Sequence, residues 1–444
     1  MKKNVLIVGN AGREHAFAWK ISQSPNLGKL FVAPGNGGTA KIATNVEIGK
    51  DDIEGLENFA KENNIDITIV GPNLPLALGI VDEFHKHGLK IFGPEKEVSK
   101  LEYSKVFAKN FMAEENIPAA KSKAFKSYED ALTYIESENF PLVIKSDGLS
   151  LGKGVYICRS LKEAEIALKA IMIDKIYGEA GNEIIIEEFL EGPELSIHAL
   201  CDGENYKLLP PSQDHKPIFN HNLGPNTGGM GSYAPVPWVT EEQLDQIKKT
   251  IIEPTLFALK KRGTPYTGCL YVGVKITSEG PKALEFNVRF GDPETESYMM
   301  LLENDFLEVI ESCIEGNISN LALSWKPEFA VCVVMASKGY PETYKNDSLI
   351  EGIEKAEKIS GVEVFHLGTK KEDGKLVSAD GRVLGVSAID KNLKKTIKKA
   401  YRAVSKIKFE DAYFRTDIAE NGDILKGVKS AMLDKILKLI KINF

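Results

Sequence analysis

The segment ALEFNVRFGDPE, residues 283–294, combines side chains that could bind a metal ion and an anion. Side chains alternate between the two faces of a strand, so Glu285, Asn287 and Arg289 would share one face, and the apolar residues between them would face a core. Carboxylate and amide oxygens are ligands that Mg²⁺ takes beside nucleotide phosphates, and a guanidinium can hold a carboxylate or a phosphate with two N–H groups. A solvated polar strand face is the simpler interpretation, but the adjoining GDPE turn and the motifs upstream favour a binding site.

A second candidate site is GNAGREH, residues 9–15, which follows an apolar strand and would open a helix. Backbone N–H groups at a helix N-terminus bind anions, and glycines permit close approach. The spacing is G-x-x-G, not the dinucleotide fingerprint G-x-G-x-x-G, and the next strand ends in APGN without the acidic residue that holds a ribose. NAD is therefore disfavoured. The motif is compatible with a phosphate or phosphoribosyl group, or with a tight turn needed only for packing.

Two further segments could bind a nucleotide. KSDGLSLGKGV, residues 145–155, is a strand ending in lysine and followed by a glycine-rich loop. It is not a P-loop, because a P-loop needs four residues between its glycines and Ser or Thr after its lysine. The segment suits a mobile flap over a polyphosphate. The alternative is a flexible surface hairpin. In EIIIEEFLEGPELS, residues 183–196, an apolar strand ends in Glu187 and Glu188. Adjacent acids are costly to bury without partners. Backbone groups at such a strand end could bind the edge of an adenine, and a carboxylate could hold ribose hydroxyls. The alternative is a plain edge strand.

Bulk properties exclude several classes of protein. The 444 residues carry 43% hydrophobic and 27% charged residues and a net charge of -7, which suggests a globular chain of roughly three domains and makes nucleic acid an unlikely partner. The five cysteines are widely spaced without a C-x-x-C pair, which argues against a disulfide framework or a zinc knuckle and is typical of reduced thiols in a cytosolic protein. No run approaches the ~18 apolar residues that cross a bilayer, so we expect a cytoplasmic protein without a membrane partner.

The chain organisation predicts α/β and α+β domains. In the first hundred residues, NVLIVG, KLFVAPG, DITIVGP and LKIFGP alternate with helical stretches, which indicates a parallel sheet whose loops gather at one edge. Residues 194–330 are expected to be mostly antiparallel, with helices at 241–262 and 294–315 and a hairpin turning at residues 278–280. The last part is expected to hold short strands and a helix at about 393–407, and its sequence shows no obvious catalytic cluster.

Taken in order, the motifs resemble one family. GNAGREH, APGNGGT, IVGPNLPL, KSDGLSLGKGV, EEFLEGPELS, QDHK, GPNTGGMGSYAP and NVRFGDPE are similar to those of the phosphoribosylamine–glycine ligase (glycinamide ribonucleotide synthetase) family of ATP-grasp enzymes, over essentially the whole chain. The resemblance implies a parallel-sheet N-terminal domain (1–103), a central ATP-grasp domain (104–326) with a mobile lid subdomain at about 120–192, and a small C-terminal α+β domain (327–444). It also implies ATP-dependent joining of glycine to 5-phosphoribosylamine through a glycyl phosphate.

The resemblance also implies roles for individual residues. The residues implied in ATP binding are Lys105, Lys145, Gly152, Lys153, Gly154, Glu187, Glu188, Phe189, Leu190 and Glu194. Those implied for the phosphoribosylamine and glycine sides are Gly9, Gly12, Arg13, Glu14, Asn36, Gly37, Asn73, Asp214, Arg289 and Asp292. Glu285 and Asn287 would hold Mg²⁺ or Mn²⁺. Lys145, Asp214 and Arg289 would be catalytic, with Arg289 pairing the glycine carboxylate.

Some positions depart from the expected family pattern. Pro217 follows Lys216 where the family usually continues DHKR, Ser150 and Leu151 replace small alanines in the flap, and Glu296 replaces the glutamine of GDPETQ. The competing hypotheses are another ATP-grasp ligase or carboxylase, a non-catalytic nucleotide-binding module and an NAD-dependent oxidoreductase. The expected partners are small-molecule substrates, with the chain acting as a monomer or a homodimer.

Overall fold

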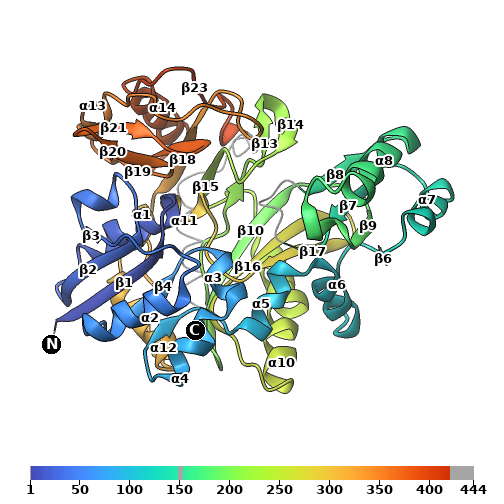
Figure 1. The fold of residues 1–444 in the computed structure, drawn as a ribbon, viewed down its shortest axis with the longest axis horizontal. Helices are drawn as coiled ribbons and strands as arrows, with labels where there is room; N and C mark the ends of the chain where they lie inside the picture. Colours follow the sequence, from blue (N-terminus) through green and yellow to red (C-terminus); the bar gives the residue numbers. More distant parts are fainter. Residues whose placement is uncertain (1, 149–153, 421–444) are drawn as a thin grey trace.

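The N-terminal part of the computed structural model, which describes residues 2–148 and 154–420, is a parallel sheet covered by helices (Figure 1). Its strand order is β3-β2-β1-β4-β5, with every pair parallel, as the sequence predicts. The strands are β1 (Lys3–Gly9), β2 (Leu27–Pro34), β3 (Thr44–Asn45), β4 (Ile67–Val70) and β5 (Ile91–Phe92). The helices are α1 (Gly12–Ile21), α2 (Ile53–Glu62), α3 (Asn73–Leu78), α4 (Ile80–Lys86) and α5 (Lys96–Tyr103). The order reverses beside β1, so the loops after β1 and β4 flank the crevice in which such sheets bind ligands.

A small antiparallel unit, here called the outer sheet, stands apart from the rest of the molecule at the right of Figure 1. Its strand order is β6-β9-β7-β8, with β6 (Ser122–Phe125), β7 (Leu142–Ser146), β8 (Val155–Cys158) and β9 (Ile184–Glu188). Helices α7 (Tyr128–Glu136) and α8 (Leu161–Leu168) pack on this sheet and close a hydrophobic core of its own. Helix α6 (Lys105–Glu114) connects it to the N-terminal part.

The central sheet is antiparallel, with the order β11-β10-β16-β17. Its strands are β10 (Glu194–Asp202), β11 (Tyr206–Leu208), β16 (Thr267–Thr277) and β17 (Gly280–Asn287). The hairpin of β16 and β17 has the turn that the sequence predicts. Around it lie the hairpin of β13 (Pro217–Phe219) and β14 (Leu223–Asn226), α9 (Glu241–Ile247), a π-helical turn at Lys248–Ile252, α10 (Glu253–Lys261), α11 (Glu294–Leu301) and α12 (Phe306–Ile314).

The single helix predicted at residues 294–315 is wrong, because two helices occupy this segment. Helix α11 ends where Leu302 turns to an extended conformation and forms a bridge with Trp325. Helix α12 begins at a new cap, since the Asp305 side chain accepts a hydrogen bond from the N–H of Leu307 at 3.0 Å. A distant pairing partner and a local cap therefore interrupt a continuous helical pattern.

The C-terminal sheet has the order β12-β15-β18-β22-β19, with β23 also pairing with β18. Its strands are β12 (Gln213–Asp214), β15 (Gly231–Ala234), β18 (Phe329–Ser337), β19 (Val362–His366), β22 (Arg382–Asp390) and β23 (Ala412–Tyr413). A hairpin of β20 (Thr369–Glu372) and β21 (Lys375–Ser378) and helices α13 (Ile353–Glu357) and α14 (Leu393–Val404) complete it. Strands β12 and β15 come from the middle of the chain, so the central and C-terminal parts share one sheet.

Helix α11 lies where the large parts meet. It packs against α1, β15, β18 and β22, and all its residues are buried. One continuous hydrophobic core joins the N-terminal, central and C-terminal sheets around it. Within the described residues, no helix combines the length and the apolar character needed to span a bilayer.

Candidate active site

A cleft of about 1200 Å³ opens between the N-terminal loops, α6, the outer sheet, the central sheet and the C-terminal sheet. Most of the residues implied by the sequence line it. They are Arg13, Glu14, Asn73, Lys105, Lys145, Gly154, Glu187, Glu188, Phe189, Leu190, Glu194, Asp214, Glu285, Asn287, Arg289 and Asp292. Gly152 and Lys153 lie outside the described residues.

Four predicted substrate residues do not line the cleft; they are Gly9, Gly12, Asn36 and Gly37. The Gly37 N–H donates to the Thr369 carbonyl at 3.0 Å, and the Asn36 side chain donates to the His366 carbonyl at 2.8 Å. A side chain at Gly12 would collide with Leu367 and Glu296. In this structure Gly12, Asn36 and Gly37 therefore join the N-terminal part to the C-terminal sheet behind the cleft.

Lysines from two elements surround one carboxylate on the outer-sheet side of the cleft. Val143 of β7 pairs with Glu187 of β9, so Lys145, two residues further along β7, lies on the same face as Glu187. Lys145 Nζ is 2.9 Å from Glu187 Oε2, and Lys109 Nζ of α6 is 3.3 Å from Glu187 Oε1. The arrangement places two ammonium groups around one buried carboxylate.

Helix α6 is tied to the end of β7 at its first turn. The Asp147 carboxylate accepts hydrogen bonds from the Ser104 hydroxyl and from the N–H of Val106, both at 3.2 Å. The Lys105 ammonium donates to the carbonyl of Gly148 at 2.9 Å. Burial lowers the pKa of Lys105. Lys105 therefore lies directly beside the strand end from which the glycine-rich loop departs.

The strand end at residues 187–190 borders an apolar part of the cleft. The apolar lining residues here are Ala108, Met112, Ala120, Val143, Leu284 and Phe286. Glu188 points away to the backbone of α6's outgoing loop, where its carboxylate accepts the N–H of Lys121 at 3.0 Å. An apolar lining beside a strand end is suited to a flat aromatic base.

The predicted metal ligands lie on the cleft face of β17, as the alternation requires. The Lys216 ammonium lies between Glu194 and Glu285, at 2.7 and 3.1 Å from their Oε1 atoms. The positive charge of Lys216 is the main reason that the pKa of Glu285 falls to about 2. Asn287 accepts a hydrogen bond from Arg289 at 3.0 Å. A carboxylate that stays ionised and an amide oxygen form a donor set that fits a hard divalent cation.

Glu102, which no sequence motif indicated, orients two predicted substrate residues. Its Oε1 atom accepts hydrogen bonds from Asn73 at 2.8 Å and from Arg289 at 2.9 Å. Its Oε2 atom accepts the N–H of Val288 at 2.8 Å. Glu102, in the last turn of α5, thus holds Asn73 and Arg289 at the cleft wall.

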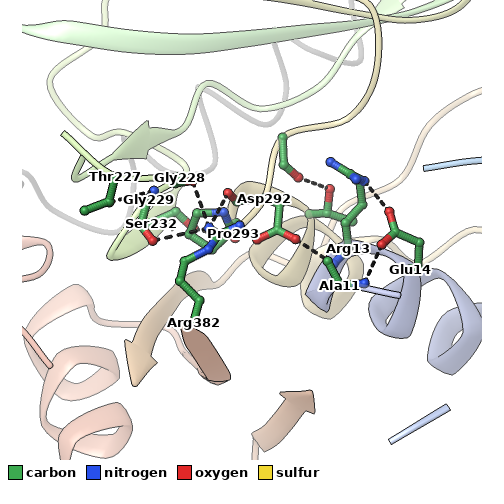
Figure 2. Close-up of polar contacts among 12 residues, drawn as sticks. Ala11, Arg13, Glu14, Thr227, Gly228, Gly229, Ser232, Asp292, Pro293 and Arg382 are labelled. Carbon is green, nitrogen blue, oxygen red and sulfur yellow. Dashed lines mark hydrogen bonds and ion pairs between the residues drawn. The ribbon is translucent and has the colours of Figure 1, made fainter. Parts of the chain in front are cut away.

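A second group of charged contacts, here called the junction, forms around Asp292. Figure 2 shows Arg382 of β22 reaching this residue. Arg382 Nη2 is 2.9 Å from Asp292 Oδ1, and Arg382 Nη1 donates to the carbonyls of Gly228 and Asp292 at 2.8 and 2.9 Å. Asp292 Oδ2 accepts the N–H of Arg13 at 3.2 Å, at the start of α1. Burial alone would raise the pKa of Asp292, but Arg382 and Arg13 hold it below its usual range. The start of α1, the turn that carries Asp292 and the start of β22 thus meet at the Asp292 carboxylate.

Asp214 is half-buried against the loop of residues 224–233, and its Oδ1 atom is buried. A side chain at Gly229 would collide with Asp214 and Pro293, so the loop backbone lies directly on this carboxylate. Burial, followed by the negative charge of Glu294, raises the pKa of Asp214 well above its usual value. A carboxyl group with a raised pKa in a cleft is a candidate for proton transfer.

The C-terminal part contributes to the cleft although its sequence shows no catalytic cluster. Tyr340, Tyr344, Asp380 and Arg382 line the cleft. The Tyr344 hydroxyl donates to the Asp380 carboxylate at 2.7 Å, and the Tyr340 hydroxyl accepts a hydrogen bond from the Gly228 N–H at 3.1 Å. Spacing could not indicate these residues, because their neighbours in the cleft are distant in the chain.

The fold and the site define an ATP-grasp enzyme, in which the outer sheet and the central sheet border a cleft lined by lysines, acidic residues and apolar side chains. The chain matches the models of the three phosphoribosylglycinamide synthetase domains, the N domain at residues 3–102, the ATP-grasp (A) domain at 103–295 and the C domain at 330–421. The chain therefore belongs to the phosphoribosylglycinamide synthetase family.

Individual relatives agree with the family match. A phosphoribosylamine–glycine ligase of Caldanaerobacter subterraneus is 48% identical over 94% of this chain and 99% of its own length, and one of Rhodopirellula baltica is 46% identical over 94% and 98%. The crystal structure of a phosphoribosylamine–glycine ligase from Thermotoga maritima is similar with a TM-score of 0.81 and 32% identity, covering 94% of this chain and 100% of that one. A biotin carboxylase domain from Hydrogenobacter thermophilus, at 15% identity and a TM-score of 0.73, shares the fold.

Proposed function

We propose that the protein joins glycine to 5-phosphoribosylamine with ATP, giving glycinamide ribonucleotide, ADP and phosphate through a glycyl phosphate. The observation that carries the proposal is that one cleft holds two lysines suited to phosphates, an acid–amide pair suited to a divalent cation and an arginine suited to a carboxylate. No nucleophile of the protein is required. Phosphoryl transfer depends on positioning and on neutralising charge, and the cleft supplies both.

In the first step a carboxylate oxygen of glycine attacks the γ-phosphorus and ADP leaves. Lys105 and Lys145 would hold the phosphates, and Arg289, fixed by Glu102, would hold the glycine carboxylate. Glu285 and Asn287 would hold Mg²⁺ or Mn²⁺, which neutralises charge between the phosphates. Glu187, the backbone at 188–190 and Glu194 would bind adenine and ribose.

In the second step the amine of phosphoribosylamine attacks the acyl carbon and phosphate leaves. Arg13, Glu14 and Asn73, which line the cleft, would bind phosphoribosylamine. Asp214, with its pKa raised chiefly by burial, is suited to accept the proton that the amine loses. Asp292 would position the GDPE turn, residues 291–294, against the bound substrates.

We also propose the domain boundaries 1–103, 104–326 and 327–444, with the outer sheet as a lid at about 120–192. The matched N domain ends at residue 102 and the matched C domain begins at residue 330, which supports these boundaries. We propose a cytoplasmic monomer or homodimer without nucleic-acid or membrane partners, supported by the net charge of -7 and by five buried free thiols.

The direct test is phosphate release from ATP with glycine and freshly made phosphoribosylamine, added separately and together, with the product identified by mass. The proposal expects release only with both substrates, together with the glycinamide ribonucleotide mass. Turnover of ATP with bicarbonate, and none with glycine, would instead identify another ATP-grasp carboxylase.

A further inference from the structure

Residues 413–419, here called the C-terminal segment, are hydrogen-bonded to the hairpin of β13 and β14, which Figure 1 shows beside the C-terminal part. The Tyr413 hydroxyl donates to the Ile218 carbonyl at 3.0 Å. The N–H of Thr416 donates to the Asn220 side chain at 3.0 Å, and that side chain donates to the Thr416 hydroxyl at 2.6 Å. The partners are 195 or 196 residues apart in the chain, so the end of the C-terminal part holds a hairpin of the central part.

Arg415 is the centre of this contact and is only 1% exposed. Its Nε and Nη2 atoms donate to the two carboxylate oxygens of Asp417 at 2.8 and 2.7 Å. Nη1 also donates to the Pro217 carbonyl at 2.9 Å, and Nη2 to the Asn222 side chain at 3.1 Å. A buried guanidinium is stable only when its charge and its N–H groups have partners. Asp417 balances the charge, and the hairpin supplies further acceptors, so the arginine and the hairpin hold each other in place.

The hairpin has little support of its own. A two-stranded hairpin is marginally stable in water, and Leu223 in this one is 61% exposed. His221 and Asn222 at its turn have φ angles of 60° and 57°, a left-handed conformation that costs free energy for residues other than glycine. The N–H of His221 donates to Asp417 at 2.8 Å, and Asn222 accepts from Arg415. The C-terminal segment therefore holds the hairpin where its backbone is most strained.

Lys216 directly precedes this hairpin and lines the cleft. Its carbonyl accepts hydrogen bonds from the N–H and the hydroxyl of Thr227 at 2.9 and 2.7 Å, which closes the base of the hairpin. Its ammonium lies 2.7 Å from Glu194 and 3.1 Å from Glu285. If the ammonium moved away, the two carboxylates would repel each other and would repel a bound polyphosphate. The position of the hairpin therefore affects how well this wall of the cleft accepts a nucleotide.

We propose that Arg415 is a positioning residue for the ligation, because by holding the hairpin it keeps the Lys216 ammonium beside Glu285 and so permits tight nucleotide binding. This inference rests on the proposed function. It gives the C-terminal segment a part in that function, although none of residues 413–419 lines the cleft. A purely structural role for Arg415 would instead affect folding and leave the nucleotide affinity of the folded protein unchanged.

The variant Arg415→Lys separates positioning from charge pairing. A lysine keeps a positive charge beside Asp417 but lacks the planar fork that reaches several acceptors at once. The measurement is the equilibrium Kd of ADP in the presence of Mg²⁺, under conditions where melting temperatures show that each protein is folded. We expect Arg415→Lys to raise this Kd about fivefold. A Kd within about twofold of the native value would overturn the inference.

Val386→Ala is the matched control for a loss of stability. Val386 is fully buried in β22, so its truncation weakens the C-terminal sheet without removing a hydrogen bond to the hairpin. Its Kd for ADP should stay within about twofold of the native value. A rise equal to that of Arg415→Lys would show that general destabilisation is the cause and would overturn the inference.

A milder variant at the same contact covers the case in which Arg415→Lys does not fold. Asn220→Ala removes both hydrogen bonds to Thr416, and Asn220 lies outside the cleft lining. We expect it to raise the Kd of ADP about threefold. An unchanged Kd for this folded variant would count against the hairpin as the element that Arg415 positions.

A double-variant cycle tests the route through Lys216. Lys216→Met should raise the Kd of ADP about tenfold. Adding Arg415→Lys or Asn220→Ala to Lys216→Met should change the Kd by less than about twofold, because the ammonium that these residues position is already gone. Additive effects, or a native Kd for Lys216→Met, would overturn the inference. Failure of the native protein to form glycinamide ribonucleotide would contradict the proposed function instead, whatever the ADP affinities are.

Discussion

The wall of the cleft around Glu187, here called the nucleotide side, and the junction at Asp292 are both built from buried charges, but the partners of those charges differ. Around Glu187, two lysines share one carboxylate, and Lys109 Nζ and Glu187 Oε1 have no hydrogen bond among the described residues. At the junction, Arg382 donates to backbone carbonyls and pairs with Asp292 (Figure 2). Asp292 Oδ1 also lacks a hydrogen bond among the described residues, so what distinguishes the junction is that its arginine binds backbone carbonyls and thereby connects separate parts of the protein.

The two regions also differ in where their residues come from. On the nucleotide side, Lys109, Lys145 and Glu187 come from α6, β7 and β9, all within residues 105–188. The junction brings together Arg13, Gly228, Asp292 and Arg382. Changes on the nucleotide side should therefore alter ligand affinity, whereas changes at the junction should alter stability and the geometry of several loops together.

The largest effect is expected at the proposed metal ligands, Glu285 and Asn287. Glu285→Gln should lower Mg²⁺-dependent turnover by about 10²–10³-fold, because the neutral amide is a weaker ligand for a cation that neutralises phosphate charge. Thermal unfolding should change little. Glu279→Gln, on the exposed turn of the same hairpin, is the control in steady-state assays. Near-native turnover of Glu285→Gln would show that Glu285 is not a metal ligand.

The junction should respond in stability. Arg382→Met leaves the buried Asp292 carboxylate without its ion-pair partner and should lower the free energy of unfolding by about 3 kcal/mol. The double variant Arg382→Met/Asp292→Asn should recover part of this loss, because it removes the unpaired charge. Urea unfolding measures both. Binding of ADP, assayed at equilibrium in conditions where the variants are folded, should change less than about twofold. A large loss of ADP affinity would remove the distinction between the two regions.

Lys109 should make stability depend on pH. Its pKa is about 8 in the folded protein and has the usual lysine value when unfolded, so between these values the unfolded chain binds more protons and stability rises with pH. The difference in unfolding free energy between the native protein and Lys109→Met should therefore grow in favour of the native protein by about 2 kcal/mol from pH 8 to pH 10. Chemical unfolding across this range measures it. A constant difference would mean that Lys109 titrates alike in both states.

The smallest effect is expected at Glu296, where the family pattern has glutamine. Both carboxyl oxygens of Glu296 are buried without a hydrogen-bond partner among the described residues. Burial, followed by the charge of Asp292, raises its pKa well above the usual value. The folded state therefore keeps a proton that the unfolded state releases, and this group destabilises the protein as pH rises.

Replacement of Glu296 by glutamine tests this account. Glu296→Gln should change the unfolding free energy by less than about 1 kcal/mol at pH 5 and should be the more stable protein at pH 8. Melting temperatures at the two pH values provide the measurement. Equal or lower stability of Glu296→Gln at pH 8 would mean that the native carboxyl is ionised and compensated.

Much of the fold and the site follows from local patterns in the chain. The apolar runs closed by glycine or proline predict the parallel N-terminal sheet, and strand alternation places Glu285 and Asn287 on the cleft face of β17. The motifs that resemble the family also indicate Lys105, Lys145 and Glu187. These features depend on side-chain period and on backbone chemistry over a few residues, which a sequence displays directly.

Only the tertiary structure decided which groups are partners. No sequence motif indicates three of these pairs, namely Glu102 with Arg289, Lys109 with Glu187, and Arg382 with Asp292. In each pair an ordinary charged residue acquires its role from a neighbour about 80 to 190 residues away. The break between α11 and α12 likewise depends on the pairing of Leu302 with Trp325, and β12 and β15 join a sheet formed mainly by the last part of the chain. Charge pairing and burial are set by distances in space, whereas residue type and period are set along the chain.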